Sequence, residues 1–137
     1  MHLKFIPVVA ILFLTISFAN GQDTAKRPAP VPKKMIQYGI ASFYSDKFQG
    51  RKTASGEIFS QKKLTAAHNT LPLGTYIRVT NLRNRKSVVV RVNDRLHHRN
   101  KRLVDLSRAA ANKIGFIKAG TTRVRVEVLG KNPPAER

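Results

Sequence analysis

The feature that most constrains the fold of this chain is a set of short segments in which apolar and polar residues alternate. The strictest is R-V-R-V-E-V at residues 123–128, which places three valines on one side and the charged residues on the other. Residues 75–80 alternate too, with Ile77 and Val79 on one face and Tyr76, Arg78 and Thr80 on the other. Because successive side chains of a strand point to opposite faces, this period of two predicts strands that bury one side.

Two further segments predict strands, and one predicts a helix. Residues 36–44 are rich in β-branched and aromatic side chains, and residues 87–92 are dense in valine and follow a polar turn at 81–86. A helix is expected over residues 108–114, because Ser107 is a good N-cap and Gly115 suits the position after the helix. Several short strands with many turn residues predict a mainly β domain closed into a small barrel, since closure removes exposed strand edges.

The two ends of the chain are expected to lie outside this domain. Residues 1–21 combine Lys4, a short apolar run and small residues before a cleavage site, which predicts a secretory signal peptide. The run is shorter than the roughly 20 residues that span a bilayer, so no stable membrane insertion is expected after cleavage. Residues 22–35 predict a Pro/Lys-rich linker, residues 36–130 the folded domain and residues 131–137 a flexible tail.

Charge and cysteine content narrow the class of protein. The formal net charge is +19, and the predicted signal peptide carries only one of these charges, at Lys4. Such a charge predicts an anionic partner. For an exported chain, periplasmic or secreted, we expect a cell-wall polymer rather than nucleic acid. The absence of cysteine excludes a disulfide scaffold and a lipid-modified cysteine.

The residues able to exchange protons are few. Glu57 follows the small-residue turn A-S-G, and Asp94 stands at the end of the 87–92 strand beside a basic residue. A carboxylate at a strand end is held rigidly, which suits a site, although a plain Asn-Asp turn explains the same pattern. Asp105 is expected either to orient the helix or to serve the site. Asp46 is expected in a turn, and Glu127 in a cross-strand charge pair.

The histidines favour no metal centre. His68 lies in a small, mostly apolar segment, where a lone histidine is more often a hydrogen-bonded structural residue than a catalyst. His97 and His98 lie among arginines and a lysine, whose charge opposes a cation. No other cluster of metal ligands is present in the sequence, so we expect neither a metal nor a cofactor.

Taken together, these segments resemble the double-psi β-barrel domain of the rare lipoprotein A family, the septal-ring lytic transglycosylases of bacteria. The resemblance runs continuously over about residues 38–129. The shared motifs are G-I-A-S-F-Y at 39–44, G-R-K-T-A-S-G-E at 50–57, L-T-A-A-H-N-T-L-P-L-G-T at 64–75, V-T-N-L at 79–82, V-V-V-R-V-N-D-R at 88–95 and D-L-S-R-A-A-A at 105–111.

The resemblance implies a six-stranded barrel with one or two short helices, and an endolytic enzyme that cleaves peptide-stripped peptidoglycan strands to 1,6-anhydro ends. It implies that the catalytic residues Asp94, Glu57 and His68 line one groove. Asp94 would be the catalytic acid, and Glu57 and His68 would position substrate or shuttle protons. Substrate contacts are expected from the residues around them. These are Tyr44, Thr53, Ser55, Asn93, Arg95 and Asp105.

One departure and two alternatives accompany this prediction. Leu96 follows the N-D-R motif where the family usually has glycine, so we expect a reshaped groove beside Asp94. A non-catalytic, expansin-like module that binds peptidoglycan by charge and aromatic faces is the first alternative. A polyanion-binding protein that acts on lipid or nucleic acid is the second, and it rests on charge alone. Peptidoglycan glycan is the expected partner, and we expect a monomer.

Overall fold

The computed structural model describes residues 35–135. The predicted signal peptide, the predicted linker up to residue 34, and the last two residues of the predicted tail lie outside this range. Within it, no helix has the length and apolar character needed to cross a bilayer.

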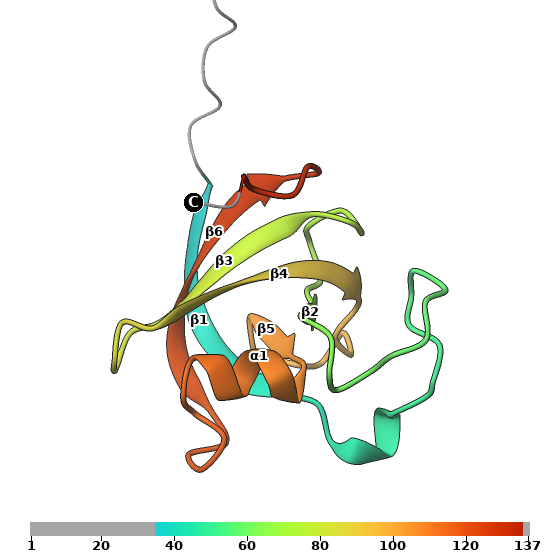
Figure 1. The fold of residues 1–137 in the computed structure, drawn as a ribbon, viewed down its shortest axis with the longest axis horizontal. Helices are drawn as coiled ribbons and strands as arrows, with labels where there is room; N and C mark the ends of the chain where they lie inside the picture. Colours follow the sequence, from blue (N-terminus) through green and yellow to red (C-terminus); the bar gives the residue numbers. More distant parts are fainter. Residues whose placement is uncertain (1–34, 136–137) are drawn as a thin grey trace, which may run out of the picture. The chain divides into compact units, whose positions relative to one another are not determined.

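The described residues form a closed barrel of six strands in the order β1-β5-β2-β4-β3-β6 (Figure 1). This confirms the prediction of a mainly β, six-stranded double-psi barrel with one or two short helices. The elements in chain order are β1 (Ile36–Phe43), the 3-10 turn η1 (Asp46–Phe48), β2 (Thr65–Ala67), β3 (Tyr76–Asn81), β4 (Ser87–Asp94), β5 (Val104–Leu106), α1 (Arg108–Lys113) and β6 (Thr122–Gly130).

The barrel combines two kinds of strand pairing. β1 runs parallel to β5 and β2 runs parallel to β4, whereas β6 pairs antiparallel with both β1 and β3. The long strands β1, β3, β4 and β6 confirm the four predicted from alternation and composition. Strands β2 and β5 were not predicted, because each has only three residues, too few to show a period.

The barrel is filled by the residues whose alternation predicted an inward face. Val79, Val90, Val92, Val124 and Val126 are all at most 1% exposed. The helix α1 packs against this core with Ala110 and Ala111, which are fully buried. Burial of a valine side chain stabilises a fold by about 1.5–3 kcal/mol.

The predicted helix is confirmed with its caps. The Ser107 side chain accepts a hydrogen bond from the Ala110 N–H, and Gly115 has a φ of +73° just after the helix. A left-handed residue at this position is the usual end of a helix, because it lets the last carbonyls find donors.

The predicted charge pair of Glu127 is confirmed, but its environment is not the open surface that the sequence pattern indicates. Arg78 Nη1 donates to Glu127 Oε2 at 3.1 Å. Glu127 is only 8% exposed, with Ile36 and Arg78 as its cross-strand partners on either side.

The segment that joins β4 to β5 is held against the middle of β1. A Cβ on Gly39 would lie 2.7 Å from Leu103 Cβ, so only glycine allows this approach. The Leu103 N–H also donates to the Ile40 carbonyl at 2.9 Å. This contact fixes the segment that carries several of the groove residues described next.

Candidate active site

A groove of about 520 Å³ lies where β1, β4 and β5 end. Its walls come from the end of β1 and the η1 turn, the end of β4 with the segment after it, and β5. The lining residues are Phe43, Tyr44, Ser45, Lys47, Phe48, Ala67, Asp94, Arg95, Leu96, His97, Asn100, Arg102 and Asp105.

Asp94 is the last residue of β4, and both of its carboxylate oxygens accept hydrogen bonds. The Tyr44 hydroxyl donates to Oδ2 at 2.6 Å, and the Ala54 N–H donates to Oδ1 at 2.9 Å. The carboxylate is half-buried and lines the groove. It therefore has a fixed position and neutral hydrogen-bond partners, and it lies in a hollow that a ligand can enter.

Tyr44 is held as a proton donor to Asp94. Burial, followed by the hydrogen bond to Asp94 and the charge of that carboxylate, raises the pKa of the Tyr44 phenol well above its ordinary value. The ring packs against Phe59 with centroids 4.2 Å apart and against Phe48 at 5.7 Å. These contacts restrict the ring, so the hydroxyl is fixed at the carboxylate.

The N–H of Ala54 reaches Asp94 because residues 52–58 form a tight loop, here called the 52–58 loop. The Thr53 N–H donates to the Glu57 carbonyl at 2.8 Å, and Gly56 has a φ of +86°. The Ser55 N–H donates to the Asn93 carbonyl at 3.1 Å, which joins the loop to the end of β4.

Glu57 forms an ion pair and does not line the groove. Its two carboxylate oxygens accept from Arg91 Nη1 and Nη2 at 2.6 and 2.5 Å. The hydrogen bond from Arg91 is the largest cause that lowers the pKa of Glu57 to about 2, with smaller contributions from Asn93 and Ser55. The carboxylate is therefore ionised at neutral pH and stabilises the base of the 52–58 loop.

His68 also lies outside the groove lining, and it is 2% exposed. Its Nδ1 accepts from the N–H groups of Thr70 and Leu71, both at 3.2 Å, and its Nε2 lies 2.8 Å from Gln37 Oε1. These contacts fit the neutral imidazole with its proton on Nε2. Burial and the nearby Arg95 lower the pKa of His68.

The structure therefore corrects the expectation that three residues line one groove. Asp94 lines it, whereas Glu57 and His68 each support a segment beside it. The reason is that hydrogen bonds hold both side chains elsewhere. Arg91 on β4 donates to the Glu57 carboxylate, and the backbone N–H groups of residues 70–71 donate to the His68 ring.

The residues predicted to contact substrate fall into two groups. Thr53, Ser55 and Asn93 lie outside the groove lining, at the 52–58 loop and the end of β4. The Thr53 and Ser55 hydroxyls are 2.9 Å apart. Asn93 is 2% exposed, and no hydrogen-bond partner is found for its Oδ1 among the described residues.

Tyr44, Arg95 and Asp105 form the second group and line the groove. Arg95 Nη1 donates to the carbonyls of His68 and Leu71 at 2.6 and 2.7 Å, which joins the segment after β2 to the groove wall. Asp105 accepts from Arg102 Nε and Nη2 at 2.8 and 3.0 Å. Its charge is therefore matched by a guanidinium.

Sequence reasoning missed several groove residues. Lys47 and Phe48 lie in η1, and Asn100 and Arg102 lie in the irregular segment between β4 and β5. No period or motif there distinguishes a lining residue from a solvated one. Leu96, the residue expected to reshape the groove, does line it. It is 8% exposed, and its N–H donates to Asn69 Oδ1 at 2.7 Å.

No group of three or more histidine, aspartate or glutamate side chains within residues 35–135 is arranged to hold a metal ion. His97 and His98 stack with ring centroids 4.3 Å apart. The groove lining offers proton exchange at a carboxylate, together with binding by cationic and aromatic side chains.

Comparisons with known proteins give a matching family model and similar relatives. The family model described as lytic transglycolase matches residues 36–126. The endolytic peptidoglycan transglycosylase RlpA of Haemophilus influenzae is 50% identical over 110 residues, 80% of this chain and 38% of that protein. The protein of the same name from Pasteurella multocida is 58% identical over 91 residues, 66% of this chain and 31% of that protein. This chain thus spans less than half the length of these relatives.

Solved structures share the fold. The apo expansin of Clavibacter michiganensis superposes with a TM-score of 0.58 at 24% identity, over 74% of this chain and 53% of that one. A Streptomyces papain inhibitor superposes with a TM-score of 0.56 at 22% identity, over 72% of this chain and 96% of that one. At these identities the likeness concerns the barrel alone.

Proposed function

The chain belongs to the rare lipoprotein A family of lytic transglycolases, and we propose that its barrel domain is an endolytic peptidoglycan transglycosylase. Its substrate is the glycan strand of peptidoglycan, and the bond cleaved joins N-acetylmuramic acid to N-acetylglucosamine. The names of relatives about 50% identical to this chain support the reaction. The supporting structural observation is the half-buried carboxylate of Asp94 in an open groove.

The reaction needs one proton-exchanging group and no water. A proton passes to the glycosidic oxygen as that bond breaks, and the C6 hydroxyl of the muramic residue attacks the anomeric carbon. The hydroxyl loses a proton as the 1,6-anhydro ring closes. One proton is given and one is recovered, so a single carboxyl can serve both steps.

Asp94 is better suited to this exchange than Asp105, the other carboxylate in the groove lining. Asp105 is paired with the permanent charge of Arg102 through two hydrogen bonds, which favours a fixed ion pair. The partners of Asp94 are a phenol and a backbone amide, which carry no charge. We therefore assign proton exchange to Asp94 and substrate positioning to the Asp105–Arg102 pair.

Glu57 and His68 are assigned as positioning residues. Glu57 holds the 52–58 loop through Arg91, and that loop supplies the Ala54 N–H to Asp94. His68 orders residues 68–71, whose carbonyls hold the Arg95 guanidinium. Neither role requires contact with the glycan.

The remaining groove residues suit a saccharide. Tyr44 and Phe48 offer aromatic surface, and Lys47, Arg95 and Arg102 add positive charge to the lining. We propose that the protein acts outside the cytoplasm, where peptidoglycan lies, after export through the predicted signal peptide, and that it acts as a monomer.

Digestion of purified sacculi tests the proposal. Wild type is expected to release anhydro-ended glycans, and Asp94→Asn is expected to reduce release by at least about 100-fold, the contribution typical of a general acid-base group. Asp46→Asn is the matched control, because Asp46 is an exposed carboxylate that does not line the groove. It is expected to retain release.

A pelleting assay with the same sacculi separates catalysis from binding. If wild type pellets with the sacculi and releases nothing, the protein is a wall-binding module and the catalytic proposal is wrong. If Asp94→Asn and wild type release equal amounts, Asp94 is not the proton-exchanging group.

A further inference from the structure

The register of β1 and β6 places an apolar row beside a cationic row on the outside of the barrel. Ile36, Tyr38 and Ile40 are alternate residues of β1 and are all exposed. Their cross-strand neighbours on β6 include Arg125, opposite Tyr38, and Arg123, opposite Ile40. Because directly opposite residues point to the same face of a sheet, the two rows form one surface.

Strand β3 and the turn after it extend this surface. Thr80 is the partner of Arg125, and the Leu82 N–H donates to the Arg123 carbonyl at 2.9 Å. A hollow of about 460 Å³ lies here. It is lined by Tyr38, Arg78, Thr80, Leu82, Arg85, Ser87 and Arg125. We call the surface formed by the outward residues of β1, β6 and β3, with Leu82 and Arg85, the outer face.

The exposed apolar side chains of the described residues gather on or beside the outer face. Tyr38 is 63% exposed, Ile36 44% and Leu82 42%, with Met35 and Ile40 next to them in the chain. Only Phe48 and Ile58, of the seven large exposed apolar residues within 35–135, lie elsewhere. A grouped set of exposed apolar residues usually marks a contact surface.

The charge of the outer face is strongly positive. It holds Arg78, Arg85, Arg123 and Arg125, while Glu127 is its one carboxylate among the described residues and is paired with Arg78.

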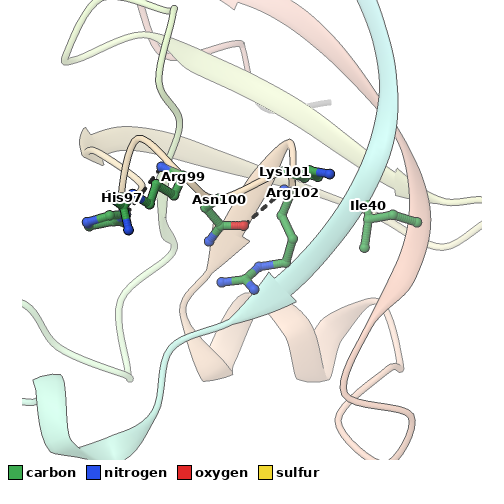
Figure 2. A pocket seen from close by; sticks show the side chains of 6 residues that line it. All are labelled: Ile40, His97, Arg99, Asn100, Lys101 and Arg102. Carbon is green, nitrogen blue, oxygen red and sulfur yellow. Dashed lines mark hydrogen bonds between the residues drawn. The ribbon is translucent and has the colours of Figure 1, made fainter.

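The positive surface continues past Ile40 onto the segment between β4 and β5. A second hollow, of about 590 Å³, is lined by Ile40 together with His97, Arg99, Asn100, Lys101 and Arg102 (Figure 2). Arg99 and Lys101 are exposed. Arg99 and Lys101, which line this hollow and do not line the groove around Asp94, thereby flank the end of the apolar row.

From this arrangement we propose that the outer face docks on the surface of an anionic lipid bilayer. Aliphatic side chains and a tyrosine, surrounded by arginines, match the interface of a bilayer, where apolar groups enter the headgroup region and cations meet acidic headgroups. A glycan offers hydroxyls and no apolar interior, so Ile36 and Ile40 would remain exposed to water if the outer face bound a glycan. The inference is independent of the proposed reaction, because the outer face lacks Asp94.

Vesicle sedimentation tests this docking. The full chain is mixed with vesicles of phosphatidylcholine alone or with phosphatidylglycerol added, and every variant keeps the same N-terminal segment. Arg123→Ser/Arg125→Ser is expected to weaken binding to the acidic vesicles by at least about tenfold, since each basic residue near an anionic surface contributes roughly fivefold. Ile36→Thr/Tyr38→Thr removes apolar contact and keeps strand-forming residues, and it is expected to weaken binding as well.

The matched control is Lys113→Ser/Lys118→Ser, which removes the same charge from exposed positions outside the outer face. It is expected to change vesicle binding by less than about threefold, as long-range charge is screened. Arg123→Lys/Arg125→Lys retains the charge and is expected to bind, which would assign the loss in the serine variant to the removed charge rather than to the arginine side chain as such.

Three results would overturn the proposal. The first is equal weakening by the control, which would assign binding to net charge. The second is loss of binding to sacculi without loss of binding to acidic vesicles in the outer-face variants, which would make the partner a wall polymer. The third is wild-type binding that is the same with and without the acidic lipid.

Discussion

The groove and the outer face use charge in opposite ways. In the groove, Asp94 and Asp105 each accept two hydrogen bonds, and Arg95 donates to two carbonyls. On the outer face, four arginines accompany a single carboxylate, and the side chains between them are apolar and exposed.

The difference indicates two kinds of task. A reaction needs groups held in place before the substrate arrives, and mutual hydrogen bonds hold them. A contact surface needs unmatched charge and accessible apolar area, which a partner then covers. The groove bonds also join distant parts of the chain: Tyr44 and Asp94 are 50 residues apart.

After the loss expected for Asp94→Asn, the largest expected effect in the comparison comes from Tyr44→Phe. The variant keeps the ring and removes the donor to Asp94, and a hydrogen bond to a charged group contributes about 1.5–3 kcal/mol. We expect release from sacculi to fall by about 10- to 100-fold, while binding to acidic vesicles stays as in wild type. The rate at which anhydro-ended glycans are released measures this effect. An unchanged rate would mean that the Tyr44 hydroxyl takes no part in the reaction.

A smaller effect is expected from the pH dependence of His68. Because its pKa in the fold is lowered, the unfolded chain takes up a proton near its ordinary value of about 6.5 while the folded chain does not. The contribution of His68 to the free energy of unfolding is therefore fully present above this pH. It decreases below this pH by up to about 1.4 kcal/mol per pH unit.

Denaturant unfolding at pH 7.5 and 5.5 measures this dependence, with His68→Gln as the comparison. The decrease in unfolding free energy between pH 7.5 and pH 5.5 is expected to be much smaller in the variant than in wild type. If wild type and variant lose equal stability over this range, the imidazole is not the group that titrates.

Glu57→Gln should have a more modest effect on the free energy of unfolding. The folded pKa of Glu57, about 2, lies below the ordinary value, so its pair with Arg91 stabilises the fold above that ordinary value and is lost as pH falls through about 2. The side chain is 36% exposed and screened, so we expect a loss of about 1 kcal/mol at neutral pH.

Urea unfolding at pH 7 and at pH 3 measures this loss of stability. The difference in unfolding free energy between wild type and Glu57→Gln is expected to be smaller at pH 3. A gap that widens toward pH 3 would contradict the assigned ion pair.

The smallest expected effect is that of Tyr38→Thr on stability. Tyr38 is 63% exposed and threonine keeps a strand-forming side chain, so unfolding free energy should change by no more than about 0.5 kcal/mol. Thermal melting checks this. A loss of several kilocalories per mole would mean that the apolar row serves the fold, and the contrast with the groove would disappear.

How far the sequence predicts the molecule depends on how local the signal is. Alternation around Val79 and Val126 is local, and the strands there were predicted, as was the helix from Ser107 and Gly115. Strands β2 and β5 depend on pairing between distant segments. The groove position of Asp94 follows from the end of β4.

The places of Glu57, His68 and Arg102 could not be predicted in the same way. Arg91 lies 34 residues from Glu57, and Gln37, one of the partners of His68, lies 31 residues from it, and a residue type does not reveal which distant group it meets. Arg102 belongs to an irregular segment whose position depends on the close approach of Leu103 to Gly39.

Mass spectrometry of sacculi digested in water enriched in heavy oxygen tests the central claim most directly. If Asp94 lets the muramic C6 hydroxyl attack the anomeric carbon, wild type produces anhydro ends that carry no heavy oxygen, and Asp94→Asn produces few ends of any kind. New reducing ends that carry heavy oxygen, or anhydro ends formed equally well by Asp94→Asn, would contradict the account.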